Sequence, residues 1–110
     1  MPLSYEERRA VYGEAIKHYG DDVQLWVALE EMSELIKALA KLYRAPEWAP
    51  MEPLVQALID EMADVTIMIE QLRIIFDANE AVQERMDFKL ERLAARILED
   101  REKGVPDAYA

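Results

Sequence analysis

Apolar residues recur every three or four positions along much of the chain, which is the spacing of one face of an α-helix. The clearest run ends at about Arg44. Its apolar positions are Leu25, Ala28, Leu29, Met32, Leu35, Ile36, Leu39 and Leu42. A later run repeats the pattern at Val82, Met86, Leu90, Leu93 and Ile97. Both runs predict amphipathic helices.

Residues at the start of the chain mark a shorter helix before the first of these runs. Ser4 followed three residues later by Glu7 is a capping box, in which each side chain accepts a hydrogen bond from the other residue's backbone N–H. Gly20 is a typical helix stop. We therefore expect a first helix from Ser4 to about Tyr19.

The middle of the chain divides at a proline-rich connection. Asp21, with Gln24 three residues later, predicts the cap of the second helix. Residues 45–53 contain three prolines, which disfavour helical conformation in the residues before them. Pro53 itself suits the first turn of a third helix, which we expect to run to Phe76.

The predicted third helix is apolar around its whole circumference. From residue 53 to 76, 15 of 24 residues are Ala, Val, Leu, Ile, Met or Phe. Such a helix is buried on more than one side, and a single four-helix monomer has difficulty covering it. We predict an all-α, four-helix bundle completed by tight homo-oligomerisation, as a homodimer or homotetramer.

The last helix should follow a break at Asp77 and Asn79 and end at Gly104 and Pro106. A chain of 110 residues fits one compact domain. The expected organisation is a single all-α domain over residues 1–104, followed by a loose C-terminal tail over residues 105–110.

Charge and composition exclude several classes of function. The 23 acidic residues outnumber 13 basic ones, giving a formal charge of −10. This balance predicts no nucleic-acid partner and no binding to an anionic membrane. The absence of cysteine excludes disulfides and thiolate metal sites and fits a reducing cytoplasm. No signal-peptide core or transmembrane run is present in the sequence, so we expect a cytoplasmic protein.

Two acidic pairs interrupt the apolar helix faces. Glu31 and Glu34 are one turn apart on the second predicted helix, and Glu61 and Asp64 are one turn apart on the third. Acidic pairs at this spacing are common on solvated helix faces. These two, however, are flanked by apolar residues one turn away, and a buried carboxylate without a partner costs several kcal/mol.

The cation that neutralises these acids is more plausibly a metal than a side chain. No Lys or Arg lies one turn from both members of either pair. A di-iron bundle needs a Glu-x-x-His motif on two helices, and the chain has one histidine. Oxygen ligands favour hard divalent ions. Four carboxylates carry −4 and two Mg²⁺ ions carry +4, which would create a neutral site able to accept a polyphosphate.

The order of these acids resembles a known family. The first motif is Glu30-Glu31-Met32-Ser33-Glu34-Leu35, and the second is Asp60-Glu61-Met62-Ala63-Asp64-Val65. The chain is similar, from about Gln24 to Ile97, to the MazG-like all-α nucleoside triphosphate pyrophosphohydrolases, which carry a Glu-x-x-Glu pair and a later Glu-x-x-Asp pair on neighbouring helices. Glu30 occupies the place of an auxiliary acid in that pattern.

The resemblance implies an enzyme that hydrolyses a nucleoside triphosphate to the monophosphate and pyrophosphate and clears non-standard nucleotides. It implies Glu31, Glu34, Glu61 and Asp64 as the catalytic and metal-binding residues. Mg²⁺ is the implied cofactor, with Mn²⁺ as a substitute. A metal there would neutralise phosphate oxygens and lower the pKa of a bound water.

Three further residues are candidates for substrate binding. The Gln24 carboxamide could read a base edge through its donor and acceptor, or could serve only in helix capping. Lys89 and Arg92 lie beside the apolar stripe of the last predicted helix, where they could reach phosphate groups. The alternative for both is an ordinary solvated helix face.

A second hypothesis belongs to a different class of protein. The chain could be a non-catalytic, oligomeric helical interaction module that keeps the acids as a structural metal-carboxylate site or uses them to bind a basic partner. Its support is the net negative charge and the C-terminal tail.

Overall fold

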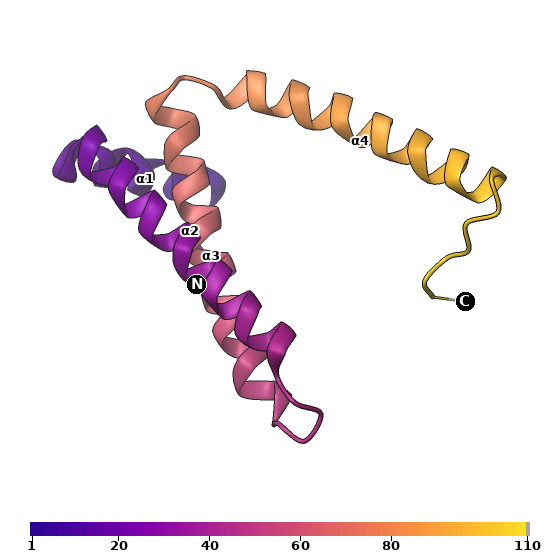
Figure 1. The fold of residues 1–110 in the computed structure, drawn as a ribbon. Coiled ribbons are helices and arrows are strands. Elements are labelled where there is room, and N and C mark those ends of the chain that lie inside the picture. Colours follow the sequence, from indigo (N-terminus) through magenta and orange to yellow (C-terminus); the bar gives the residue numbers. More distant parts are fainter. Residues whose placement is uncertain (110) are drawn as a thin grey trace. The chain divides into compact units, whose positions relative to one another are not determined.

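The computed structural model describes residues 1–109 and contains, over that range, four α-helices and no strand (Figure 1). The helices are α1 (Tyr5–Tyr19), α2 (Asp21–Arg44), α3 (Met51–Ile75) and α4 (Asn79–Glu102). The all-α prediction is confirmed. The chain divides into two compact units, Met1–Asp77 with the first three helices and a second from Ala78 onward with α4.

The predicted capping box at the start of α1 is confirmed. The Glu7 backbone N–H donates to Ser4 Oγ and the Ser4 backbone N–H donates to Glu7 Oε1, both at 3.1 Å. Hydrogen bonding of the Glu7 carboxylate with the Ser4 backbone N–H, and to a lesser extent with the Ser4 side chain, lowers the pKa of Glu7 from the ordinary value of 4.5. At the other end, Gly20 adopts φ 94°, a left-handed conformation that glycine tolerates, and its N–H donates to the Ile16 carbonyl at 2.8 Å.

Three predicted boundaries need correction. The prediction that Asp21 caps α2 was wrong. Asp21 is the first helical residue of α2, and the N-cap is Gly20, which makes no side-chain hydrogen bond. The Asp21 carboxylate therefore only complements the helix dipole. Helix α3 begins at Met51, before the predicted start. The expectation that Pro53 lies in its first turn, where no N–H is needed, is confirmed. Asn79 is the first residue of α4, and the break centres on Asp77, with φ 47°.

Helices α2 and α3 form an antiparallel hairpin, which packs through one stripe on each helix (Figure 1). We call these the inner stripes; their members are buried or half-buried and follow one another at alternating spacings of four and three residues. On α2 the inner stripe is Gln24, Ala28, Glu31, Leu35, Ala38 and Leu42. On α3 it is Leu54, Leu58, Glu61, Val65, Met68 and Leu72. This spacing is typical of helix pairs in bundles.

Helix α1 packs against both α2 and α3, so α3 is contacted on more than one side, as its all-round apolar sequence predicted. The buried core of the described chain is nevertheless small. It consists of Ala28, Val65 and Met68, together with the buried polar residues Gln24 and Gln71. Half of the large apolar side chains of α2 and α3 remain exposed.

Within the second unit, α4 carries the predicted apolar stripe, but none of its residues is buried. The Arg85 and Arg92 guanidinium groups lie 4.9 and 5.9 Å from the Phe88 ring centroid. In the predicted tail, Asp107 pairs with Arg101 at 2.9 Å, and Ala110 lies outside the described residues. Across residues 1–109, none of the helices combines the length and apolar character that crossing a bilayer requires.

Replacing Ser4 by alanine should lower the free energy of unfolding by about 1 kcal/mol, because the first turn of α1 loses its side-chain acceptor. The stability that the Glu7 carboxylate contributes should also be lost as the pH falls through its lowered pKa. Once protonated, this side chain no longer offers a charged acceptor to the Ser4 N–H. Urea unfolding followed by circular dichroism measures both. Ser33→Ala is the control: this hydroxyl bonds the Glu30 carbonyl within α2, and its loss should be close to neutral.

Candidate metal centre

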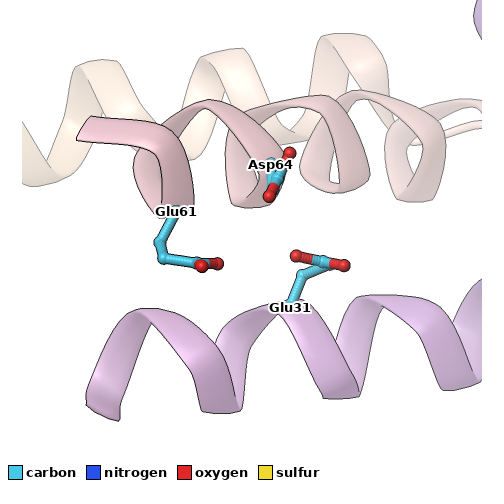
Figure 2. A group of neighbouring side chains, drawn as sticks. All are labelled: Glu31, Glu61 and Asp64. Carbon is cyan, nitrogen blue, oxygen red and sulfur yellow. The ribbon is translucent and has the colours of Figure 1, made fainter. Parts of the chain in front are cut away.

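The hairpin brings acids from both predicted pairs together. Glu31 and Glu61 occupy facing positions of the two inner stripes, and Asp64 lies one turn beyond Glu61 on α3 (Figure 2). Glu31 and Glu61 are half-buried, whereas Asp64 is exposed. The three carboxyl groups therefore form a cluster, which we call the acid centre, that is walled by two helices and open to solvent at Asp64.

The spacing of the acid centre suits a divalent cation. One carboxylate oxygen from each of Glu31, Glu61 and Asp64 lies within 4.8 Å of the other two. Oxygens on opposite sides of Mg²⁺ are about 4.2 Å apart, and those around the larger Ca²⁺ are about 5 Å apart. A small side-chain movement would thus bring all three oxygens into the shell of Mg²⁺ or Mn²⁺.

The electrostatics of the centre also favour a cation. Partial burial raises the pKa of Glu31 above the ordinary 4.5, and the neighbouring Asp64 and Glu61 charges raise it further, as does hydrogen bonding with Asp64. Glu61 Oε2 is buried without a hydrogen-bond partner among residues 1–109. The acids therefore repel one another and leave an acceptor unused, so the centre gains from a bound proton or metal.

No basic side chain supplies that positive charge within residues 1–109. The ion pairs found in this part of the chain join Arg73 to Glu70, Arg101 to Asp107 and Lys103 to Glu99, and none includes a member of the acid centre.

The other two acids of the predicted set lie outside the cluster. Glu34 is exposed on α2, one turn from Glu31, and its charge adds to the raised pKa of Glu31. Glu30 is also exposed, and its backbone carbonyl accepts a hydrogen bond from Ser33 Oγ at 2.7 Å. Both acids are exposed and do not belong to the cluster of three.

Gln24, a candidate for base recognition, is buried between the helices. Its Nε2 donates to Gln71 Oε1 at 2.6 Å, and the Gln71 amide lies 3.7 Å from Met68 Sδ. The capping role considered for the Gln24 side chain is absent, since the N-terminus of α2 has no side-chain cap. Its role in substrate binding stays a prediction, and would require the carboxamide to leave Gln71.

Gln71 is the residue that sequence reasoning missed. It is only 4% exposed and bonds the two helices at the end of the hairpin near the α2 N-terminus. The sequence indicates its burial in one way: the amide has apolar residues one turn away on both sides, within the most hydrophobic helix of the chain. Pairing it with Gln24 required the antiparallel register of α2 and α3.

Lys89 and Arg92 are exposed side chains of α4, in the second unit. The Arg92 guanidinium lies over the Phe88 ring of its own helix. Within that unit both residues belong to a solvated basic face, and their contact with phosphate stays a prediction.

Comparisons with protein-family models, curated proteins and solved structures find no match to this chain.

Replacing Gln24 by leucine should cost about 1–3 kcal/mol of stability, because it leaves the buried Gln71 amide without its partner. The double variant Gln24→Leu/Gln71→Leu should recover part of that loss, since neither polar group is then buried alone. Chemical unfolding of the two single variants and the double variant gives the coupling energy. Strictly additive losses would contradict a direct buried bond.

Replacing Glu31 by glutamine should stabilise the metal-free protein. Because its pKa is raised on folding, the folded chain binds this proton more tightly than the unfolded chain does. Wild-type stability should thus fall as the pH rises from about 4.5 through the raised pKa. Thermal unfolding in EDTA should show this fall for the wild type and a weaker one for Glu31→Gln. Added Mg²⁺ should raise the wild-type Tm more than that of the variant.

Proposed function

We propose that this protein is a Mg²⁺-dependent nucleoside triphosphate pyrophosphohydrolase, which converts a (deoxy)nucleoside triphosphate to the monophosphate and pyrophosphate. The observation that carries the proposal is the convergence of Glu31, Glu61 and Asp64 from two helices, with oxygens within 4.8 Å of one another. None of the ion pairs found among residues 1–109 includes these acids. The order of the acids along the chain, which resembles the MazG-like enzymes, supplies the choice of reaction.

Divalent metal is the link between these acids and a triphosphate. Without it, a cluster of carboxylates repels a substrate that is itself strongly anionic. Mg²⁺, or Mn²⁺ in its place, would supply charge neutralisation and polarisation of the α-phosphate. Glu31, Glu61 and Asp64 would hold it, with Glu34 as a further ligand and Glu30 as an auxiliary acid.

The reaction needs a water, a proton acceptor and an open approach. A water oxygen forms a bond to the α-phosphorus, the bond from that phosphorus to the bridging oxygen breaks, and pyrophosphate leaves. The water proton passes to a carboxylate, for which the unbonded Glu61 Oε2 is available. Asp64 is exposed, so a polyphosphate can reach the centre from solvent. Gln24, Lys89 and Arg92 are the proposed contacts for base and phosphates.

Homo-oligomeric assembly and a cytoplasmic location complete the proposal. They rest on the large exposed apolar surface of the hairpin and on the absence of cysteine.

Glu61→Gln should reduce Mg²⁺-dependent pyrophosphate release by more than about 100-fold, because even residues that merely orient metal ligands contribute about 10–100-fold. The substrate is identified first, by measuring pyrophosphate release from a panel of standard and non-standard nucleoside triphosphates with Mg²⁺ and with Mn²⁺. Asp60→Asn is the matched control: it removes an exposed acid adjacent in α3 and should leave the rate near wild type. Failure of the wild type to release pyrophosphate from any nucleotide would refute the proposal.

A non-catalytic interaction module with a structural metal site is the second candidate, favoured by the many exposed apolar side chains. Activity separates the two. In both the module and the enzyme, Glu61→Gln should lower the Tm in Mg²⁺, because metal bound to the native state stabilises it. Only the enzyme should release pyrophosphate, and only the enzyme should lose that activity in Glu61→Gln while the variant stays folded in EDTA.

A further inference from the structure

The positive charge of α2 lies on one side of the acid centre only. Residues 35–46 contain Lys37, Lys41 and Arg44 and no acidic residue. Residues 21–29, on the other side of the centre, contain two acids and no basic residue. In a chain with 23 acidic and 13 basic residues, the second half of α2 is thus a local reversal of charge. We call Lys37, Lys41 and Arg44 the basic stripe.

The basic stripe would gain from a bound anion. Its three members are exposed and follow one another at one-turn spacing, where like charges repel. None of them takes part in the ion pairs found among residues 1–109. Arg44 Nε donates to the Ala40 carbonyl of its own helix, and Lys41 and Arg44 complement the dipole at the end of α2. Lys37 lies about two turns before that end, so the dipole does not explain it.

Lys37 and Lys41 lie on the side of the hairpin to which the acid centre opens. Each directly precedes a residue of the inner stripe of α2, as Asp64 does on α3. One residue corresponds to about 100° around a helix axis, and this rotation has opposite senses in two antiparallel helices seen from one end (Figure 1). The lysines and Asp64 therefore turn toward the same side. Long helical side chains also lean toward the N-terminus of their helix, which for both lysines is the direction of the acid centre.

The spacing along α2 matches a short chain of phosphates. Measured along the helix axis, Lys37 lies about 4.5 Å beyond Glu34 and Lys41 about 10 Å beyond it. Each ammonium group stands at the end of a flexible four-carbon stem. Phosphates that extend from a metal at the acid centre toward the hairpin turn would therefore meet the two ammonium groups in order. Arg44, about 15 Å beyond Glu34, lies past the end of a triphosphate.

Two cavities lie at opposite ends of the hairpin and differ in charge. One, of about 350 Å³, lies at the turn between α2 and α3, and its charged lining residues, Lys41 and Arg44, are both basic. The other, of about 360 Å³, lies between α1 and α3 near the start of α2. Its lining is mainly apolar and includes Ile67, with Arg8 as its charged residue. The cavity at the turn suits the anionic end of a nucleotide, and the apolar one suits the uncharged end.

We propose that Lys37 and Lys41 bind the β- and γ-phosphates of the substrate, so that the triphosphate runs along α2 from the acid centre toward the hairpin turn. The nucleoside then points the other way, toward α1. Ammonium groups form charge-assisted hydrogen bonds with phosphate oxygens, and these would also hold the pyrophosphate that leaves. The identity of the ligand rests on the proposed function, to which the basic stripe adds the direction of the substrate.

Binding of inorganic pyrophosphate in Mg²⁺, measured by isothermal titration calorimetry on the full chain, tests the proposal without requiring turnover. Lys37→Gln and Lys41→Gln should each weaken this binding about tenfold or more, because each removes a charge-assisted hydrogen bond. Arg44→Gln should weaken it less than about threefold, since solvent and salt screen a charge at that distance. Lys17→Gln is the matched control: it removes an exposed lysine of α1 and should leave binding unchanged.

A nucleoside monophosphate provides the second readout. Its binding in Mg²⁺ should be the same in the wild type, Lys37→Gln and Lys41→Gln, because the two lysines contact only the phosphates that leave. A wild type that does not bind pyrophosphate, or unchanged pyrophosphate binding in both lysine variants, would overturn the proposal. Weakened pyrophosphate binding in Arg8→Gln with the lysine variants unchanged would overturn it in favour of the opposite direction. Lysine-dependent pyrophosphate binding in a protein that hydrolyses no nucleotide would support the anion site and refute only the proposed reaction.

Discussion

Packing between α2 and α3 uses a narrow stripe on each helix, and two of its twelve positions are glutamates. Glu31 and Glu61 face each other across the hairpin, so the contact that builds the core also forces like charges together. Such an arrangement is costly in a bare protein because the carboxylates repel one another and lose water. The loss of hydration and the repulsion raise the pKa of Glu31.

A bound divalent ion, as in the proposed function, would offset this cost. It would neutralise the carboxylates that repel one another, so folding and metal binding would be linked at the same residues. Asp64 is exposed and Glu61 retains an unbonded oxygen, so the centre can exchange ligands with solvent. These properties suit a catalytic ion better than a permanently enclosed structural one.

The hairpin has three distinct surfaces because successive residues of a helix point about 100° apart. Inner positions such as Ala28 and Val65 join α2 to α3. Residues one place later, such as Leu29 and Ile59, are exposed apolar side chains. Asp64, one place before an inner position, lies on the side where the acid centre opens to solvent.

Features that depend on neighbouring residues could be predicted from the sequence. The Ser4–Glu7 capping box, the Gly20 stop and the helical class follow from local spacing and backbone preference. The Asp21 cap failed because Gly20 already occupies the N-cap position, a choice that the local sequence left open. The one-turn spacing within each acid pair also depends only on neighbouring residues, so it could be predicted from the sequence.

Features that depend on register across the hairpin were decided only by the tertiary structure. Roughly thirty residues separate Glu31 from Glu61, and only the antiparallel pairing of α2 with α3 selects Asp64 for the centre and leaves Glu34 at its edge. The same register pairs Gln24 with Gln71. In the sequence, the apolar residues of α2 merge into one broad stripe. Packing against α3 divides that stripe into a covered half and an exposed half, because a helix meets each neighbour along a single direction.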